Sequence, residues 1–110
     1  MARPDATTPL RSLLFTPGSN EKMLSKAATS GADAALFDLE DAVAPDMKEK
    51  ARPMVLQAIK ETAAAKSGPP VITVRVNDVT TGLLEGDLEG IVCPDLDAIK
   101  LAMTNSAAWR

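Results

Sequence analysis

Three carboxylates lie within four residues in the segment Asp38-Leu39-Glu40-Asp41. The segment follows the apolar run Ala34–Phe37, whose pattern predicts a buried strand. Carboxylates this close together repel one another unless a cation, an arginine or a shared proton relieves them. Because α/β folds build their active sites at the carboxyl ends of parallel strands, the segment predicts acid–base or cation chemistry at that end.

An arginine, Arg75, stands within the apolar run Val71–Val76. A charged side chain in such a strand must point into a barrel or cleft that holds its partner. Its guanidinium offers two parallel donors to a carboxylate or to the oxygens of a 2-oxo acid. A structural ion pair with Glu40 or Asp41 is the alternative. Asn77 is expected to face the same ligand, so the sequence predicts a site for a small anionic substrate that carries a carbonyl group.

A second candidate binding element is the turn Pro17-Gly18-Ser19-Asn20, which joins a predicted strand to a predicted helix. Free backbone N–H groups at a helix N-terminus suit a phosphate or carboxylate, although many such turns bind nothing. Lys22 and Lys26 lie one turn apart and could reach a phosphate as point charges; solvent-facing lysines are the alternative. The remaining helical acids are expected to be caps or solvent-facing: Asp46, Glu49, Glu61, Asp87 and Glu89.

Composition excludes several kinds of site. The chain has no histidine, no tyrosine and a single cysteine, Cys93, which rules out a Ser-His-Asp triad, a histidine-bearing zinc site and an internal disulfide. A net charge of −3 without a basic cluster argues against a nucleic acid partner. No segment approaches the roughly 20 apolar residues of a membrane span. Residues 1–9 show no targeting pattern and are expected to form a disordered tail, so we expect a cytoplasmic protein, with a mitochondrial location left open.

Four short apolar runs alternate with longer polar-patterned segments, which predicts the order β-α-β-α-β-α-β. The predicted strands are Ser12–Thr16, Ala34–Leu39, Val71–Val76 and Ala98–Ala102. A (β/α)₈ (TIM) barrel needs about 250 residues. The predicted fold class is therefore α/β, a partial TIM barrel of about the first four βα units, in residues 10–102. A small doubly-wound sheet, complete in itself, is the alternative.

Capping residues predict where the helices begin and end. The first helix is expected to follow Ser19 as N-cap and to stop at Gly31. Its inward-facing residues are expected to be Met23, Leu24, Ala27 and Ala28. The second is expected to follow Asp46, with Glu49 completing a capping box. Pro53 either kinks this helix or marks a later start, and we expect the kink. A third, shorter helix is predicted from residue 84 to residue 92.

Four motifs follow one another along the chain. They are Arg11-Ser-Leu-Leu-Phe-Thr-Pro-Gly18, Ser30-Gly-Ala-Asp33, Asp38-Leu-Glu-Asp-Ala-Val-Ala-Pro45 with Lys50-Ala-Arg52, and Val74-Arg-Val-Asn77. Over about residues 10–101 they resemble the citrate lyase β-subunit family, the superfamily of HpcH/HpaI-type aldolases and malyl-CoA or citramalyl-CoA lyases. The resemblance implies a TIM barrel, usually oligomeric, that uses Mg²⁺. Such enzymes make or cleave a carbon–carbon bond between an acetyl-type enolate and a 2-oxo acid, often as a CoA thioester.

The resemblance also implies roles by position. Arg75 is similar to the arginine that holds the oxo group or carboxylate, where it helps the metal to stabilise the enolate. Phe15 and Lys26 match positions that contact CoA in the malyl-CoA lyases, whereas Glu40 and Asp41 resemble acids near the metal and its water. The predicted catalytic residues are thus Arg75, Glu40 and Asp41, and the predicted substrate-binding residues are Arg75, Asn77, Phe15, Gly18 and Lys26.

The chain departs from the family pattern at its end. The family's metal ligands, a Glu and an Asp, come from later strands beyond residue 110, so no metal ligand is assigned here. Leu101-Ala102-Met103 stands where the family usually reads Leu-Pro-Lys, and residues 103–110 are predicted to be a tail outside the family.

The sequence therefore predicts a Mg²⁺-dependent carbon–carbon lyase acting on a citryl, malyl or citramalyl thioester. Its products would be acetyl-CoA, or an acetyl thioester, and a 2-oxo acid. We expect the lyase to form a homo-oligomer, and the 110-residue chain alone to be inactive. The alternative is a non-catalytic fragment that binds CoA-like anions or pairs with a full-length relative.

Overall fold

A computed structural model describes residues 12–65 and 70–101. Within them, four parallel strands form one sheet in the order β1-β2-β3-β4. The strands are β1 (Leu13–Pro17), β2 (Ala34–Asp38), β3 (Val71–Val76) and β4 (Ala98–Leu101). They confirm the predicted runs to within one residue. The predicted tails, residues 1–9 and 103–110, and Ala102, the last residue of the predicted fourth strand, lie outside the described residues.

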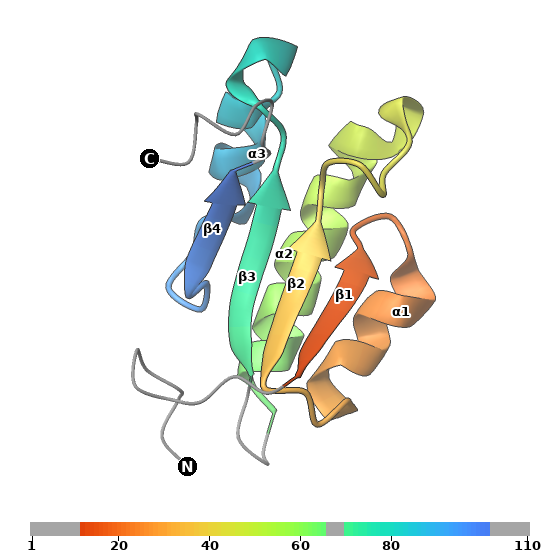
Figure 1. The fold of residues 1–110 in the computed structure, drawn as a ribbon, viewed down its shortest axis with the longest axis vertical. Coiled ribbons are helices and arrows are strands. Elements are labelled where there is room, and N and C mark those ends of the chain that lie inside the picture. The colour runs from red at the N-terminus through yellow and green to blue at the C-terminus, as the bar shows by residue number, and fades with distance from the viewer. Residues whose placement is uncertain (1–11, 66–69, 102–110) are drawn as a thin grey trace.

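Three helices connect the strands (Figure 1). They are α1 (Glu21–Lys26), which a 3₁₀ turn extends over Ala27–Thr29, α2 (Lys48–Ala63), which follows a 3₁₀ turn at Pro45–Met47, and α3 (Leu84–Ile91), which follows a 3₁₀ turn at Val79–Thr81. No helix of the described residues is both long and apolar enough to cross a membrane.

All three helices pack on the same face of the sheet (Figure 1). A strand–helix–strand crossover is almost always right-handed, so consecutive crossovers in one direction place every helix on one side. A doubly-wound sheet would instead reverse its strand order and carry helices on both faces. The sheet therefore contradicts the doubly-wound alternative and is consistent with part of a TIM-barrel-like fold.

The core lies between the sheet and the helices. Phe37, Ile72 and Val74 of the sheet are fully buried against Val55 and Ile59 of α2. Burying each such side chain contributes roughly 1.5–3 kcal/mol. Because side chains alternate along a strand, this packing also fixes which residues point to the opposite, open face.

The open face carries the polar residues that the sequence singled out. Pro17, Asp38, Arg75 and Lys100 are register partners across the four strands, so they form one row across the carboxyl half of the sheet. On the same face Leu13 and Phe15 are 60% and 42% exposed. The helices thus hold the sheet from behind, while the polar row faces the side that they leave open.

Two predicted helix starts were wrong. Asn20, not Ser19, caps α1, because its Oδ1 accepts a hydrogen bond from the Met23 N–H at 3.0 Å. Met23 is also 39% exposed rather than inward-facing, whereas Leu24 and Ala27 are buried as predicted. The glycine predicted to end this segment, Gly31, has the expected positive φ of 76°.

The second helix begins later than predicted. A 3₁₀ turn occupies Pro45–Met47, so Asp46 does not cap α2, and Met47 precedes the helix without a side-chain capping bond. The helix then continues through Pro53, which contradicts a start at the proline. A proline at this position removes one internal N–H donor from the helix; the expected kink stays a prediction.

Candidate functional site

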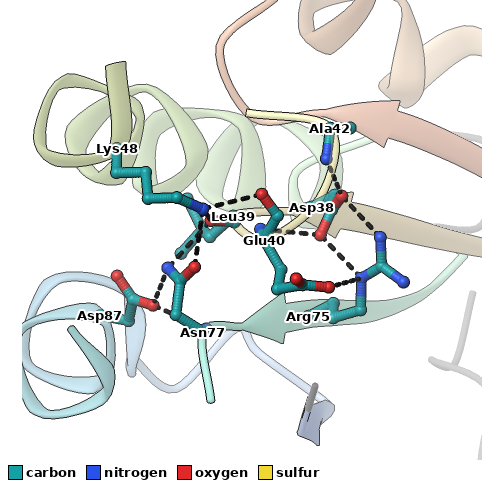
Figure 2. A network of polar contacts seen from close by, with 8 residues as sticks. All are labelled: Asp38, Leu39, Glu40, Ala42, Lys48, Arg75, Asn77 and Asp87. Carbon is teal, nitrogen blue, oxygen red and sulfur yellow. Dashed lines mark hydrogen bonds and ion pairs between the residues drawn. The ribbon is translucent and has the colours of Figure 1, made fainter. Parts of the chain in front are cut away.

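Asp38, at the end of β2, is the centre of the site (Figure 2). Its Oδ1 accepts hydrogen bonds from Arg75 Nε at 2.8 Å and from the Glu40 N–H at 2.9 Å. Its Oδ2 accepts from Arg75 Nη2 at 2.7 Å and from the Ala42 N–H at 2.8 Å. Asp38 itself is fully buried. This carboxylate therefore fixes both the arginine and the segment that follows β2.

The ion pair shifts the pKa of both partners. Burial alone would raise the pKa of Asp38, but the hydrogen bonds from Arg75, Glu40 and Ala42, with the arginine charge, lower it below its usual value. The hydrogen bond to Asp38 raises the pKa of Arg75 further above its ordinary value. Both groups are accordingly charged at neutral pH. The predicted alternative, an ion pair between Arg75 and Glu40 or Asp41, is only partly met, since Asp38 is the main partner and Glu40 Oε1 lies 3.7 Å from Arg75 Nε.

Glu40 differs from Asp38 in that its pKa is raised above the ordinary value. Burial raises its pKa, and so do the hydrogen bond to Asp41 and the charges of Asp41 and Asp38; the charge of Arg75 opposes them. The Glu40 side chain is nevertheless 25% exposed. A carboxyl with a raised pKa beside an arginine has the character of a general acid or base.

Phe15 and Gly18 adjoin this cluster from β1. The guanidinium of Arg75 lies 5.6 Å from the centre of the Phe15 ring, in cation–π range. The Gly18 N–H donates to the Asp38 carbonyl at 2.7 Å. A Cβ at Gly18 would lie 2.5 Å from that carbonyl oxygen and 2.8 Å from a methyl of Val55. Only glycine therefore allows this turn to approach the end of β2.

Three N–H donors in and after the β1–α1 turn are already engaged within the chain. The Gly18 N–H is bound to Asp38, the Asn20 N–H donates to the Pro17 carbonyl, and the Met23 N–H is capped by Asn20. Lys26 lies elsewhere. It lines a surface cavity with Leu14, Thr16 and Met23, on the helix side of β1, opposite to Phe15 by the alternation of the strand. Its predicted contact with CoA stays a prediction.

Asn77 is buried and belongs to a network that the sequence did not reveal (Figure 2). Its amide N–H groups donate to the Leu39 carbonyl at 2.9 Å and to Asp87 Oδ2 at 2.7 Å. Its Oδ1 accepts from Lys48 Nζ at 2.7 Å. The two donors that a substrate would need are thus engaged within the chain, and the predicted contact between Asn77 and a ligand stays untested.

Asp87 was predicted to face solvent, and that was wrong. It is fully buried, and Arg52 Nε donates to its Oδ1 at 2.9 Å. Its Oδ2 accepts from both the backbone and side-chain N–H groups of Asn77. The pattern of α3 did not reveal this because the cation that neutralises Asp87 lies 35 residues earlier, on α2.

The described residues do not offer a complete magnesium site. Mg²⁺ requires near-octahedral oxygen coordination and is usually held by one or two carboxylates with water and substrate oxygens. In residues 12–65 and 70–101, no group of three or more acidic or cysteine side chains is placed to hold a metal. The buried carboxylate of Asp38 is already engaged by four N–H donors. No step of the chemistry is therefore assigned to a metal held by these residues alone.

Known proteins resemble the chain over most of its length. The HpcH/HpaI aldolase/citrate lyase family matches residues 11–109, which includes most of the predicted tail at 103–110. A citrate lyase subunit beta of Leuconostoc mesenteroides subsp. cremoris is 35% identical over 89% of this chain and 32% of its own length. A (3S)-malyl-CoA thioesterase of Cereibacter sphaeroides is 44% identical over 91% of this chain and 34% of its own length. The human mitochondrial citramalyl-CoA lyase is 39% identical over 76% and 24%.

A solved structure agrees with these relatives. RipC from Yersinia pestis superimposes with a TM-score of 0.56 at 31% identity, over 90% of this chain and 37% of the RipC chain. The chain thus spans about a third of the length of the proteins that it matches. By the family match and by these identities, the chain belongs to the HpcH/HpaI aldolase/citrate lyase family.

Proposed function

We propose that this chain contributes the substrate-binding arginine, Arg75, to the active site of a carbon–carbon lyase. The reaction would cleave or form a 3-hydroxyacyl thioester (citryl, malyl or citramalyl) and yield an acetyl thioester and a 2-oxo acid. The observation that supports this most directly is the orientation of Arg75. Asp38 engages one edge of its guanidinium, through Nε and Nη2, on the face of the sheet that the helices leave open.

The other edge of the guanidinium is suited to a substrate. Nη1 takes part in no hydrogen bond between described residues, and Figure 2 shows it pointing away from Asp38. Nη1 and the second N–H of Nη2 can donate in parallel to a carboxylate or to an oxo group. Phe15 supports the guanidinium plane from one side. Arg75 is thereby oriented before a ligand arrives, which lowers the entropy cost of binding.

In the proposed cleavage, Glu40 or Asp41 accepts the proton of the 3-hydroxyl group. The carbon–carbon bond then breaks, its electron pair passes to the thioester as an enolate, and the hydroxyl carbon becomes the carbonyl of the 2-oxo acid. Arg75 stabilises the negative charge that the 3-oxygen carries after it loses its proton and before the bond breaks, and it then holds the carbonyl of the 2-oxo acid. Magnesium is expected from the family resemblance, with ligands from outside the described residues. We propose that the 110-residue chain alone binds substrate without turning it over.

Calorimetric titration with pyruvate tests the role of Arg75. We expect binding by the unchanged chain and at least about tenfold weaker binding by Arg75→Lys, because an ammonium cannot replace the two-pronged donor. Lys50→Arg, a change of cation at an exposed position of α2, is the matched control and should bind like the unchanged chain. Equal affinities in all three chains, or no binding to the unchanged chain, would refute the proposed function.

Product analysis separates the remaining possibilities. Magnesium-dependent release of acetyl-CoA from malyl-CoA or citramalyl-CoA would show that the chain alone is active and contradict that part of the proposal. Release of free CoA would instead indicate thioester hydrolysis, the activity for which the Cereibacter relative is named. Binding of CoA with no product, unaffected by Arg75→Lys, would favour the non-catalytic fragment.

A further inference from the structure

Lys48, the first residue of α2, reaches the main chain that carries the acids. Its ammonium donates to the Glu40 carbonyl at 2.8 Å, to the Leu39 carbonyl at 3.2 Å and to Asn77 Oδ1 at 2.7 Å. An ammonium has three N–H donors, so these three neutral oxygens use all of them. Among residues 12–65 and 70–101, Lys48 is therefore not paired with a carboxylate. It binds the two carbonyls immediately after β2.

A network of hydrogen bonds through Asn77, Asp87 and Arg52 also fixes the position of Lys48. Asn77 is held by Asp87 through two hydrogen bonds, at 2.9 and 2.7 Å. Asp87 is held by Arg52, which lies one turn beyond Lys48 on the same helix and also donates to the Leu83 carbonyl at 3.1 Å. Lys48 and Arg52 thus converge on the Asn77–Asp87 pair, as Figure 2 shows for Lys48.

Helix α3 is shaped to accept Arg52. A Cβ at Gly86 would lie 2.7 Å from the guanidinium of Arg52, and a Cβ at Gly90 would lie 3.2 Å from its Cβ. Glycine in a helix interior is destabilising relative to alanine. The two glycines that weaken α3 are therefore the residues that make room for the cation neutralising Asp87.

We propose that Lys48 is a positioning residue: its ammonium fixes the main chain of Glu40 and thereby holds the Glu40 carboxyl beside Arg75. Asn77 and Asp87 hold Lys48 in place. Glu40 is gripped from two sides, since Asp38 accepts its N–H and Lys48 donates to its carbonyl. With both backbone groups fixed, the side chain is directed toward Arg75 Nε, 3.7 Å away. The proposal rests on the proposed function only for the role that it gives to Glu40.

The Nε–H resonance of Arg75 reports this placement in an NMR titration without any ligand. Asp38 and Glu40 both lie within reach of Nε, so the resonance should shift in two steps, the lower from Asp38 and the higher from Glu40. Asp41 and Arg75 are the other charged groups that face Glu40, and Lys100 is the register partner of Arg75 on β4. We expect Lys48→Met to reduce the amplitude of the higher step at least twofold. Lys50→Met removes the same charge at an exposed position of the same helix and should leave both steps unchanged.

A milder variant is included in case Lys48→Met does not fold. Lys48→Gln removes the charge but keeps N–H donors, and it should retain more of the higher step than Lys48→Met. A full-sized higher step in Lys48→Met would overturn the proposal. Loss of the fold in both variants would also overturn it, because Lys48 would then serve the whole domain rather than Glu40. A chain that shows the step but binds no pyruvate would defeat the proposed function and leave this inference intact.

Discussion

Asp38 combines two tasks that usually fall to different residues. It orients the guanidinium of Arg75, which comes from a neighbouring strand, and it accepts the N–H groups of Glu40 and Ala42 from its own chain segment. A fully buried carboxylate would be costly to the fold without such donors. The positions of Arg75 and of the segment after β2 therefore both depend on this one carboxylate.

Asp38→Asn tests that dependence. We expect it to lower the free energy of unfolding by about 3 kcal/mol, since removing one partner leaves a buried ion pair broken. The folded pKa of Asp38 lies below its ordinary value of 3.8. Its contribution is therefore present above that value and lost as the pH falls through the folded pKa. In urea unfolding between neutral pH and pH 3, the difference in unfolding free energy between the unchanged chain and Asp38→Asn should shrink only at the acid end. Asp46→Asn, at an exposed position, should change little at any pH.

Glu40→Gln should have the opposite pH dependence. The folded pKa of Glu40 is raised above its ordinary value of 4.5, so the folded chain holds this proton more tightly than the unfolded chain. Stability must then fall as the pH rises from that value through the folded pKa. Glu40→Gln removes the fall, and its stability relative to the unchanged chain should increase from pH 4.5 to 7 in urea unfolding. A constant difference over that range would contradict the shift; Glu49→Gln, on the exposed face of α2, is the control.

The sequence predicted the pairing partners of Arg75 only in part. It identified the arginine and the acidic segment, because charges at the ends of apolar runs stand out. It did not identify Lys48 or Arg52, which look like ordinary charges at the start of a helix. The sequence held two signals. Lys48 and Arg52 are spaced one helical turn apart, and so are the two glycines that flank Asp87, Gly86 and Gly90. Pairing them required the contact between α2 and α3, which no local pattern contains.

At the scale of elements, the strand positions and the start of α3 at Leu84 were predictable, whereas the starts of α1 and α2 were not. Short apolar runs between turn signals identify strands, and β3 coincides with its predicted run, Val71–Val76. Helix starts depend on which of several adjacent polar residues caps the first turn. Ser19 and Asn20 compete at α1, and at α2 a 3₁₀ turn at Pro45–Met47 intervenes before the helix.

The close approach of the β1–α1 turn to β2 predicts unequal effects of two glycine substitutions. Gly18→Ala places a methyl against the Asp38 carbonyl and Val55, and such overpacking should cost about 3 kcal/mol. Gly31→Ala meets open space, but its positive φ of 76° strains an alanine by about 1 kcal/mol. Urea unfolding of both variants measures which substitution lowers the free energy of unfolding more. A smaller loss for Gly18→Ala than for Gly31→Ala would contradict the close approach.

At the scale of the whole molecule, the sheet has two edges and one uncovered face among the described residues. β1 and β4 are the outer strands, and all four residues of β4 are exposed. Leu13 and Leu101, one on each edge strand, are both 60% exposed. Unpaired strand edges with apolar side chains are templates for association with another chain.

We therefore expect the 110-residue chain to self-associate as its concentration rises. Leu101→Lys introduces a charge on β4 of the kind that protects natural edge strands, and it should shift the chain toward the monomer. Light scattering over a concentration series measures the effect. Gln57→Lys, which adds the same charge at an exposed position of α2, controls for net charge. A monodisperse monomer of the unchanged chain at every concentration would contradict this expectation.

The shared carboxylate at the end of β2 has a consequence for how the site could change over time. Each Asp38 oxygen accepts one N–H from the loop that follows β2 and one from the Arg75 guanidinium. A substitution that changes the conformation of this loop would therefore also displace the arginine. Substrate preference would more easily be altered at Phe15 or Lys100, which border the arginine without sharing that carboxylate. Selection for a different ligand at this site should therefore accumulate replacements around Arg75 and leave the Asp38–Arg75 pair unchanged.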